Sequence, residues 1–498
     1  MILFVNPRAT KPANRRFPLS IMAVGAALPA HLEWEIIDEN LPDCDVLGEV
    51  AAYQAAGKRV DVIALTVMPG PQLVSAVRLS KALKRKFPGI PLVWGGNFGS
   101  LYPAPVLNAP YVDWLIKGQG EQTFVELLEV LDGKRDPAEV AGLCYRNEDG
   151  EHVIGKERVW VGPAELPDPR YDKINVADYL ADSLLGKRTG VYQASIGCPF
   201  ACSFCGVISV FGRKEKVQEP ARMAEHLRCL IDEFGMDALH FYDNNFFLNE
   251  KHALKIVDAL EPLGIKWWCE SRVDTLSKFS DETWGRLKSA GLEMVFCGAE
   301  SGSNEVLAKM QKGITTDQTE FVAAKAREFD IIPEFSFVFG DPDAPEREIE
   351  NTISFIYKLK GINPDLEMIT YHYTPTPQRD STYGDVDPLS GTPTDLEDWT
   401  QPEWVDWMSH ENPDLPWMSD QLRARVADFE TVLRARFPSR NDRKTRAWGK
   451  LAGQWLARRR WERKAYSDPK LLRNVQKWSR KRPVSKQEYG HLRGEKLG

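Results

Sequence analysis

Apolar runs of strand length alternate with helical segments in two separate stretches of this chain. The first stretch covers residues 1–145, and the second begins at residue 186 and continues for about 200 residues. Such alternation is typical of α/β folds with parallel sheets, because each helix carries the chain back to the start of the next parallel strand. We therefore expect two consecutive α/β domains, of which the first is a doubly wound sheet.

The runs that we expect to form strands are short and rich in aliphatic and aromatic residues. In the first stretch they are residues 2–6, 33–38, 60–66, 91–94 and 114–117, with a helix over 72–87 that ends in basic residues. In the second stretch they are 190–196, 237–242, 265–272, 294–299, 334–340 and 367–373, with a helix over 220–234. Residues 146–185 are expected to form a connector, with a hairpin edge at 151–161 and a proline-rich segment at 163–171.

Three cysteines lie close together directly after the first strand of the second stretch. Cys198, Cys202 and Cys205 follow the spacing C-x3-C-x2-C, and Phe204 stands immediately before the last of them. Thiolates suit iron-sulfur clusters, and three of them on one loop can bind three irons of a 4Fe-4S cluster and leave the fourth iron open. A zinc site and three buried structural thiols are the alternatives. The other cysteines lack ligand spacing and are expected to be buried thiols: Cys44, Cys144, Cys229, Cys269 and Cys297.

The composition is that of an ordinary globular protein. The 498 residues are 43% hydrophobic and 27% charged, and no window approaches 18 consecutive apolar residues. We therefore expect several domains with sizeable cores and no membrane-spanning helix. The first residues read as a strand rather than as a signal peptide, and eight cysteines in so long a chain are not a disulfide scaffold. We expect a cytoplasmic protein.

The cysteine loop, with Phe204 before Cys205, resembles the signature of the radical S-adenosylmethionine (SAM) enzymes. The segment before it resembles the cobalamin-binding domain of the subfamily that includes methyltransferases and the anaerobic porphyrin ring cyclase. This resemblance covers about residues 1–385 and implies a 4Fe-4S cluster, SAM and cobalamin. It implies an α/β fold with a Rossmann-like cobalamin-binding domain (1–145), the connector (146–185), a partial (βα)6 barrel (186–385) and a mostly helical C-terminal region (386–498).

The resemblance places SAM at the carboxyl ends of the barrel strands. Asp243 would accept hydrogen bonds from the ammonium group of SAM, and Glu300, in the sequence G-x-E-S-G-S, would accept them from its hydroxyl or amino groups. The residues expected to bind SAM are Phe204, Tyr242, Asp243, Asn244, Arg272, Glu300 and Ser301. Catalytic side chains are not assigned, and the candidates are Glu270, Arg272 and Tyr373. Relatives often have a glycine turn after the last strand, where this chain has Gln378, Arg379 and Asp380.

Three loops rich in glycine or proline follow strands of the first stretch, where ligands of such sheets bind. They are residues 66–71 and the two glycine loops, 95–100 and 118–121. A structural sheet with tight turns is one explanation of these loops. The resemblance instead assigns the two glycine loops to the corrin edge and the dimethylbenzimidazole tail of cobalamin. The residues expected to bind cobalamin are Met68, Gly95, Gly96, Asn97, Gly118, Gln119, Gly120 and Glu121.

The chain lacks the D-x-H-x-x-G motif that supplies a histidine ligand to cobalt in better-known cobalamin enzymes. His31 is the only histidine before residue 152, and it stands in a helix-to-strand turn. We therefore expect cobalamin without a histidine lower axial ligand, with the turn 67–69 covering its lower face. The alternative role of Met68 is that of a loop residue packed on the core.

The chain beyond residue 385 falls outside the resemblance. Residues 385–420 hold Trp399, Trp404, Trp407 and Trp417 among prolines and acids and are expected to form a lid over the barrel. Residues 421–498 contain 23 Lys and Arg against 7 Asp and Glu, in a chain whose net charge is −7. A strongly basic tail therefore follows an acidic body.

Two helices are expected in this basic region, over residues 419–437 and 446–466. The second carries Trp448, Leu451, Trp455 and Leu456 opposite three consecutive arginines. We expect this apolar side to pack on the acidic barrel, and peripheral contact with an anionic membrane surface is the alternative. Nucleic-acid binding is not expected, because the chain has no recognised reader module.

The resemblance implies a cobalamin-dependent radical SAM C-methyltransferase. A 5′-deoxyadenosyl radical formed from SAM would take a hydrogen atom from an unactivated carbon, and methylcobalamin would donate the methyl group. A cyclase or rearrangement enzyme without net methyl transfer shares these motifs, and a noncatalytic iron-sulfur or cobalamin sensor is a remote alternative. The expected partners are a small-molecule substrate, hydrophobic or ring-bearing, and an electron donor such as flavodoxin or ferredoxin.

Overall fold

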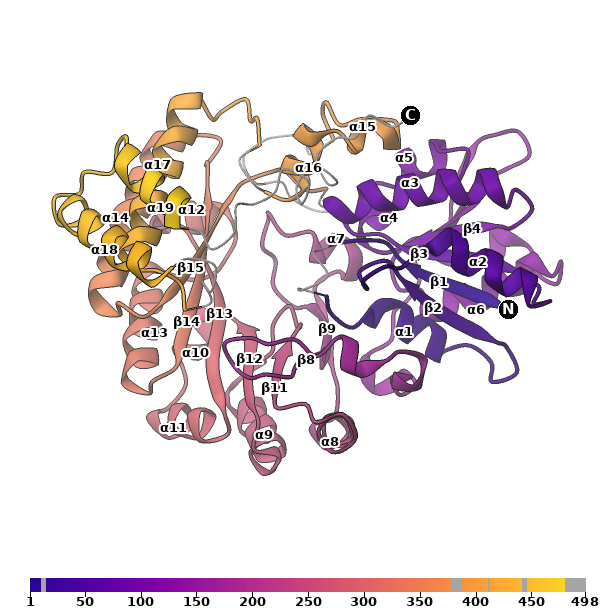
Figure 1. Ribbon diagram of the computed structural model, residues 1–498, viewed down its shortest axis with the longest axis horizontal. Coiled ribbons are helices and arrows are strands. Elements are labelled where there is room, and N and C mark those ends of the chain that lie inside the picture. Colours follow the sequence, from indigo (N-terminus) through magenta and orange to yellow (C-terminus); the bar gives the residue numbers. More distant parts are fainter. Residues whose placement is uncertain are drawn as a thin grey trace.

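The computed structural model describes residues 1–9, 15–377, 383, 387, 389–410, 413–440 and 446–479, so the expected turn 378–380 lies outside the described residues. An N-terminal domain and a barrel domain lie side by side, and a C-terminal region packs on both of them (Figure 1). The predicted α/β fold class is confirmed by two largely parallel sheets.

The N-terminal domain is built on a seven-stranded sheet in the order β2-β1-β3-β4-β5-β6-β7. Its strands are β1 (Ile2–Asn6), β2 (Trp34–Asp38), β3 (Val62–Thr66), β4 (Leu92–Gly95), β5 (Trp114–Ile116), β6 (Leu143–Arg146) and β7 (His152–Ile154). The first five strands are parallel, whereas β6 and β7 are antiparallel. The sheet thus extends beyond residue 145, because the expected hairpin edge pairs with β6 and joins the sheet.

Helices cover both faces of this sheet, and β1 shows how they do so. Leu3 and Val5 share one core with α2 (Val46–Ala55) and α3 (Pro71–Lys86). The alternate residues Ile2 and Phe4 enter a second core with α1 (Leu19–Ala26) and α6 (Glu121–Leu131). Since successive side chains of a strand point to opposite faces, the sheet is buried on both sides, as a doubly wound fold requires.

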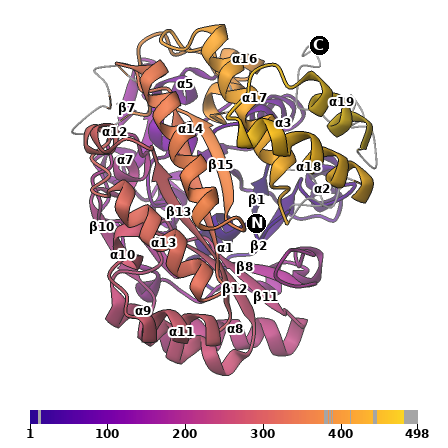
Figure 2. The same cartoon turned by 90° about the vertical axis from the view of Figure 1, so that its left-hand side faces the viewer.

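The barrel domain has a six-stranded parallel sheet in the order β15-β14-β13-β12-β11-β8. Its strands are β8 (Thr189–Tyr192), β11 (Ala238–Phe241), β12 (Lys266–Ser271), β13 (Leu292–Glu300), β14 (Ile332–Phe339) and β15 (Glu367–His372). Five helices lie along its outer face in Figures 1 and 2: α8 (Pro220–Phe234), α9 (Glu250–Leu260), α11 (Asp281–Ser289), α13 (Thr316–Glu328) and α14 (Pro345–Ile362). The inner face of the sheet carries the residues that are candidates for function.

The strand expected over residues 190–196 is in fact two strands. After β8 the chain turns away from the barrel, and β9 (Ser195–Cys198) pairs antiparallel with β10 (Lys214–Val217) in a separate hairpin. Gly197 has a φ of +85°, and a Cβ at this position would lie 2.2 Å from the carbonyl oxygen of Lys214. Only glycine allows this close approach, so the hairpin that carries Cys198 depends on it.

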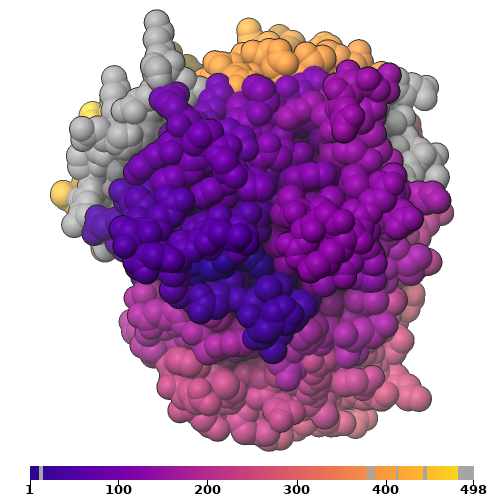
Figure 3. Space-filling view, turned by 90° about the vertical axis from the view of Figure 1, so that its right-hand side faces the viewer, coloured from indigo at the N-terminus to yellow at the C-terminus, as the bar shows by residue number. Residues whose placement is uncertain are grey.

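The segment expected to form a lid over the barrel instead connects the two domains. In its first part, α15 (Leu396–Trp399) and α16 (Pro402–Met408) pack on the N-terminal domain, where Figure 3 shows the orange segment along its top. Trp399 is fully buried, with ring centroids 5.3 Å from Phe98 and 4.6 Å from Tyr102. Farther along, the indole of Trp417 donates to the carbonyl of Gly340 in the barrel at 2.9 Å. We call residues 389–418 the strap.

The strap is followed, among the described residues, by α17 (Asp420–Arg436), α18 (Ala447–Glu462) and α19 (Lys470–Ser479). The predicted apolar face of α17 is confirmed, since Val426, Phe429, Val432 and Leu433 are buried in the core of the barrel domain. The predicted packing face of α18 is wrong: Trp448, Leu451 and Trp455 are exposed, and Gly449, Gly453, Ala457 and Trp461 are buried. Among the described residues, no helix is long and apolar enough to cross a membrane.

Candidate functional site

The three cysteines lie on a loop that is hydrogen-bonded to the barrel domain. Cys198 ends β9, and the amide of Cys205 donates to the carbonyl of Cys202 at 3.2 Å, which closes the turn between them. The neighbouring Ser203 donates its amide to the carbonyl of Met310 at 2.9 Å. These bonds fix the loop beside the turn that follows α12 (Asn304–Lys309).

Of the thiols of this loop, that of Cys202 is buried and those of Cys198 and Cys205 are partly buried. Burial raises the pKa of Cys205 to about 11 and also raises the pKa of Cys198. Bare thiolates are therefore unfavourable here, and binding to iron would supply the free energy that keeps them deprotonated. Within the part of the chain that the structure describes, no three metal-binding side chains converge on a single ion. A 4Fe-4S cluster does not need such convergence, because each thiolate binds a different iron.

Arg272 links the cysteine loop to the inner face of the barrel. Its guanidinium stacks on Phe200 at 3.6 Å and donates to Cys202 Sγ at 3.6 Å. The same group donates to Asp274 Oδ1 at 2.8 Å and to the carbonyl of Lys312. A fixed positive charge beside a thiol stabilises the thiolate, so this buried arginine suits a cluster ligand.

Lys312 supplies a second buried positive charge, and nothing in the sequence singles it out. Its ammonium lies 2.7 Å from Glu300 Oε1 and 5.7 Å from the ring centre of Phe204. Ser336 donates to the other oxygen of Glu300 at 3.3 Å. Glu300 has a φ of +61°, a conformation that is strained for any residue except glycine and that is typical of functional sites. The carboxylate of Glu300, a predicted SAM ligand, is thus already paired with Lys312 and Ser336.

A group of buried acceptors lies at the carboxyl end of β11, beside the cysteine hairpin. Asp243 is fully buried, accepts from the amide of Ala194 at 3.2 Å, and has no partner for Oδ1. Asn245 donates to Glu215 at 3.3 Å, and each of these two side chains keeps one unpartnered oxygen. Burial raises the pKa of Asp243 to about 7 and that of Glu215 to about 8. Unpartnered buried oxygens cost free energy, and an ammonium group would satisfy them.

Glu215 was not predicted from the sequence. It lies on β10 opposite Gly197, one residue from the position that pairs with Cys198. The only signal that could have found it is a glutamate in the short strand that returns after the cysteine loop. Because the hairpin itself was not predicted, this position could not be brought next to Asp243.

The remaining residues expected to bind SAM lie in different surroundings. Tyr242 is 36% exposed and accepts from Arg16 Nε of the N-terminal domain at 3.0 Å, and Asn244 beside it is exposed. Ser301 is buried under α14, where its hydroxyl lies 3.4 Å from Glu348 and 3.3 Å from Thr352. The hydroxyl of Ser301 therefore already has partners within the barrel wall.

Tyr373, a candidate catalytic residue, is also engaged. Its hydroxyl donates to the carbonyl of Tyr383 at 3.0 Å, and its side chain is 3% exposed. Burial raises the pKa of Tyr373 well above its usual value. Tyr373 is therefore a neutral phenol that packs against Trp417 of the strap.

One rung of the barrel sheet carries carboxylates on three of its strands. Glu270 of β12 is in register with Phe296 of β13, which is in register with Glu334 of β14 and then with Glu367 of β15. Burial, with the charge of Asp243, raises the pKa of Glu270 to about 7. Burial, with the carboxylates of Glu367 and Glu270, raises the pKa of Glu334 to about 8.

Next to this rung lies an aromatic stack on the same face. The ring of His240 on β11 lies 3.9 Å from that of Trp268 on β12, with an angle of 3° between the planes. Burial lowers the pKa of His240 to about 3, so this imidazole is neutral. His240 Nε2, Trp268 Nε1 and Glu334 Oε2 are buried and have no hydrogen-bond partner in the described chain. The inner face therefore offers both hydrogen-bonding groups and a flat apolar surface to a small molecule.

The loops expected to bind cobalamin meet at the carboxyl edge of the N-terminal sheet. Gly96 has a φ of +97°, and a Cβ there would lie 2.7 Å from the carbonyl of Val67, so the loop after β4 is in contact with the turn after β3. A Cβ at Gly95 or at Gly118 would meet nothing within 4 Å, and Met68 beside them is 45% exposed. Open space over bare backbone is what a planar ring needs for close approach, so these loops fit cobalamin.

The other residues of the glycine loops are more constrained. Gln119 exchanges two hydrogen bonds with the backbone of Val161, at 2.8 and 3.0 Å, so its amide is occupied by the connector. Asn97 begins α4 (Asn97–Leu101), Gly120 precedes α6, and burial raises the pKa of Glu121. Of Gln119, therefore, the backbone but not the side-chain amide remains available to a ligand.

His31 lies far from these loops along the sheet. It precedes β2 and therefore stands at the amino ends of the parallel strands, whereas the glycine loops follow the carboxyl ends. Its position agrees with the prediction that it does not bind cobalt, and the absence of a histidine lower ligand remains a prediction.

The cysteine loop and the glycine loops face each other across the domain boundary. Gly206, next to Cys205, directly precedes α7, which packs on α4. A Cβ at Gly206 would lie at an ordinary van der Waals distance from Leu101 Cδ1 of α4, 3.6 Å, and 3.1 Å from Thr376 Cγ2. The indole of Trp160 in the connector donates to the carbonyl of Phe211 in α7 (Val207–Phe211) at 2.9 Å. The structure thus brings the two predicted cofactor sites together.

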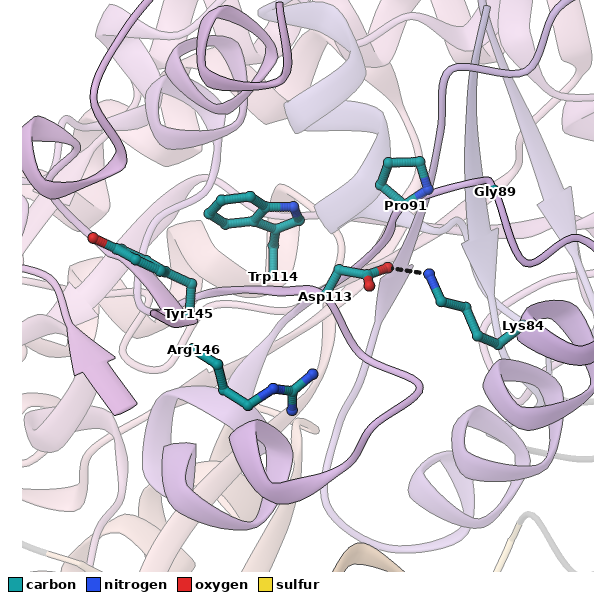
Figure 4. A pocket seen from close by; sticks show the side chains of 7 residues that line it. All are labelled: Lys84, Gly89, Pro91, Asp113, Trp114, Tyr145 and Arg146. Atoms are coloured by element: carbon teal, nitrogen blue, oxygen red, sulfur yellow. Dashed lines mark hydrogen bonds and ion pairs between the residues drawn. The ribbon is translucent and has the colours of Figure 1, made fainter. Parts of the chain in front are cut away.

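A surface pocket of about 420 Å³ lies elsewhere on the N-terminal domain (Figure 4). It is lined by Lys84, Gly89, Pro91, Asp113, Trp114, Tyr145 and Arg146. Lys84 pairs with Asp113 at 2.6 Å, and Arg146 donates to backbone carbonyls such as that of Val112 at 2.9 Å. Pro91 and Trp114 mark the amino ends of β4 and β5, which is the edge opposite to the glycine loops. We assign no ligand to this pocket.

Comparison with known families identifies both halves of this site. A sequence model of the Radical SAM superfamily matches residues 192–356, and one of the B12 binding domain matches residues 7–128. The first range contains the cysteine loop and the acceptors of β11, and the second contains the glycine loops. The fold and the site therefore define a radical SAM enzyme with a cobalamin-binding domain.

Two curated relatives extend over both domains. An uncharacterized methyltransferase of Pyrococcus horikoshii is 30% identical over 349 residues, which are 69% of this chain and 73% of the relative. The anaerobic magnesium-protoporphyrin IX monomethyl ester cyclase of Rubrivivax gelatinosus is 26% identical over 327 residues, which are 64% of this chain and 57% of the cyclase. The chain belongs to the family of cobalamin-binding radical SAM enzymes.

A solved structure shares the arrangement of domains. It is that of OxsB, a cobalamin-dependent SAM radical enzyme with aqua-cobalamin and SAM bound. Its TM-score is 0.62 at 18% identity, and the match covers 86% of this chain and 60% of OxsB. At this identity the likeness concerns the fold alone.

Proposed function

We propose that this protein is a cobalamin-dependent radical SAM C-methyltransferase. The observation that carries the proposal is the junction at Gly206, where α7, which directly follows the cysteine loop, packs on α4 of the N-terminal domain. Methyl transfer to a carbon radical requires the methyl donor and the site of hydrogen abstraction to lie within reach of one substrate. Two cofactor loops in contact meet this requirement without a large domain movement.

The side chains would have distinct tasks at this junction. Cys198, Cys202 and Cys205 would hold the cluster, with Arg272 stabilising the thiolate of Cys202. Asp243, with Asn245 and Glu215 beside it, would accept the ammonium group of SAM. With both cofactors bound, SAM would supply a 5′-deoxyadenosyl radical that abstracts a hydrogen atom. Cobalamin would supply a methyl group to the resulting carbon radical.

The N-terminal loops would hold cobalamin against the barrel. The contact set is Met68, Gly95, Gly96, Asn97, Gly118, the backbone of Gln119, Gly120 and Glu121. The corrin would lie over the bare backbone at Gly95 and Gly118, with no histidine below the cobalt. Such a cobalamin would have its lower face covered by the turn at Met68.

The substrate would bind on the inner face of the barrel, between the two cofactor sites. The unpartnered groups of His240, Trp268 and Glu334 would hydrogen-bond it, and the His240–Trp268 stack would hold an apolar or ring-bearing part. Glu270 lies on β12, and Arg272, which directly follows this strand, contacts the cysteine loop at Cys202. An electron donor such as flavodoxin or ferredoxin would reduce the cluster.

A cyclase without net methyl transfer is the second candidate, and the Rubrivivax relative favours it. Methyl transfer is preferred because the methyltransferase relative is more similar, at 30% identity against 26%, and is covered over 73% of its length against 57%. Both reactions use the same loops, so the product distinguishes them.

The test is SAM cleavage followed by product analysis. Protein prepared without oxygen, supplied with iron, sulfide, cobalamin and a reductant, should convert SAM to 5′-deoxyadenosine. A Cys202→Ser variant should not, whereas a Cys229→Ser variant, altered in a helix outside the site, should. With a substrate found by screening extracts, a mass gain of about 14 Da supports methyl transfer. A product without this gain supports the cyclase, and the absence of SAM cleavage would overturn both.

A further inference from the structure

The last two described helices expose large apolar side chains that nothing in the described chain covers. On α18, Trp448, Leu451 and Trp455 are 49, 68 and 73% exposed. On α19, Leu471 and Trp478 are 57 and 65% exposed. We call these five residues the Trp-Leu face. Exposed aromatic and aliphatic side chains are common singly on protein surfaces, but five on one helix pair form a patch that suggests an interaction.

The packing of the helices explains why α18 presents this side to the outside. Gly449, Gly453 and Ala457 form its buried stripe, and a Cβ at Gly449 would lie 1.9 Å from Ser479 Cβ of α19. Small residues let the helix backbones approach closely, which leaves the large side chains on the opposite surface. The outward position of the Trp-Leu face is thus fixed by the fold.

The exposed apolar residues of α19 lie together on one stripe of the helix. Arg473 and Gln476 point toward α17, where they bind Asp428 and the carbonyl of Thr431. Leu471 and Trp478, seven residues apart and therefore on one stripe of the helix, face away from that contact. The end of α19 meets the start of α18 where Ser479 lies against Gly449, and Trp478 and Trp448 are the neighbours of these two residues in the sequence. Figure 2 shows the three helices grouped at one corner of the molecule.

The surroundings of the Trp-Leu face are strongly basic. Residues 446–479 contain 10 Lys and Arg against 2 Asp and Glu, a net charge of +8 in a protein whose total is −7. Arg459 on α18 and Lys477 on α19 are exposed next to the apolar side chains. Tryptophans among long basic side chains suit the boundary between water and acyl chains, where the rings enter the headgroup layer and the charges stay outside it.

We infer that the Trp-Leu face binds an anionic lipid surface. The charge decides among occupants: an anionic membrane attracts a region of charge +8, whereas a second copy of this chain would bring the same charge against it. Nucleic acid would attract the charges but would leave the leucines and much of the tryptophan surface without a partner. The contact is peripheral, since its apolar residues lie on one side of each helix.

The experiment is co-sedimentation of the full-length protein with vesicles. One set contains phosphatidylcholine alone, and the other contains phosphatidylcholine and phosphatidylserine in a ratio of about 7 to 3. We expect sedimentation with the anionic vesicles and at least about tenfold less with the neutral ones, and a loss of binding as salt screens the charges. Equal binding to both vesicles, or binding to neither, would overturn the inference.

Variants connect the binding to this face. Leu451→Ala combined with Trp455→Ala should lower the partition coefficient about tenfold, because both side chains would enter the interface. Val159→Ala combined with Leu389→Ala, which removes exposed apolar residues at 86 and 53% exposure outside the face, should leave binding unchanged. Circular dichroism melting should be unchanged for both variants, since all four positions are exposed.

Two further outcomes would contradict the inference. In the first, a chain that ends at Ser479 loses binding while the Leu451→Ala, Trp455→Ala variant keeps it, which would assign the contact to residues 480–498. In the second, the wild-type protein sediments as a dimer without lipid and the same double variant is monomeric, which would assign the face to self-association. A monomer with lipid binding that depends on the face supports the inference.

Discussion

At the scale of single residues, the site is organised by two buried positive charges beside the cysteine loop. Arg272 reaches Cys202, and Lys312 reaches Glu300. Each is tied to partners on other strands or turns, so neither can be removed without leaving a buried group unpaired. Their contribution is therefore measurable as stability as well as activity.

The Lys312–Glu300 pair gives the first prediction. Lys312→Met leaves the Glu300 carboxylate buried without its cation and should lower the unfolding free energy by about 3–5 kcal/mol. Adding Glu300→Gln removes the unpaired charge and should restore part of that loss. Urea unfolding of the two single variants and the double variant measures the coupling. Losses that simply add would show that the two residues do not interact.

Glu334 gives a prediction for pH. Its pKa is about 8 in the folded protein, whereas an unfolded glutamate has a pKa of about 4.3. Between these values the unfolded chain releases the proton that the folded chain keeps, so the unfolding free energy falls as pH rises, by up to about 1.4 kcal/mol per pH unit. Glu334→Gln removes this contribution. Urea midpoints from pH 5 to 8 should decline less steeply in the variant, and parallel curves would contradict the raised pKa.

A site residue could be predicted from the sequence only where a motif marks it. Asp243 follows a strand end and Glu300 lies in G-x-E-S-G-S, and both are buried beside the cysteine loop. Glu215 and Lys312 lie equally close but have no motif, because their positions follow from the β9–β10 hairpin and from the turn after α12. Contacts of this kind are set by tertiary structure and leave no local pattern.

At the scale of elements, the loops after β3, β4 and β5 determine what the N-terminal sheet can hold. Gly95→Leu would place a side chain in the open space at the end of β4, where no atom lies within 4 Å of a Cβ. We expect the fold to be retained and bound cobalamin to be lost, measured by its visible absorbance after gel filtration. Gly89→Leu, also in open space but at the opposite edge, is the control. Equal cobalamin binding by both variants would place the ligand elsewhere.

The strap gives another prediction at this scale. Trp399→Ala removes a fully buried indole from between Phe98 and Tyr102 and should cost about 3–5 kcal/mol. Because the indole anchors the strap to the N-terminal domain, proteolysis within residues 389–418 should become faster. Leu389→Ala, at an exposed position, should not change the cleavage rate. Unchanged cleavage of the Trp399→Ala variant would show that the strap is held by other contacts.

The faces of helices were harder to predict than their positions. The apolar side of α17 was recognised because its large residues are the buried ones. In α18 the large residues are exposed and the glycines are buried, so ranking faces by hydrophobicity selected the wrong side. Close helix packing favours small residues, and only the position of α19 shows that such packing occurs here. The split of one expected strand into β8 and β9 has a similar cause, because pairing with β10 decides it.

At the scale of the whole molecule, the order of the two α/β domains followed from the alternation of strands and helices. Their junction did not, because the packing of α7 on α4 joins segments about 110 residues apart in the sequence. The strap was expected to cover the barrel. It instead connects both domains, because Trp399 packs against Phe98 and Tyr102 of the N-terminal domain. The proposed two-cofactor reaction depends on the junction of the two domains at Gly206.

The central claim is that one chain holds an iron-sulfur cluster and cobalamin side by side. Its most direct test is iron and cobalt analysis of protein purified without oxygen and supplied with hydroxocobalamin. We predict about four irons and one cobalt per chain, and loss of iron but not of cobalt in the Cys198→Ala, Cys202→Ala, Cys205→Ala variant. Iron without cobalt in the wild-type protein, or iron retained by the variant, would contradict the claim.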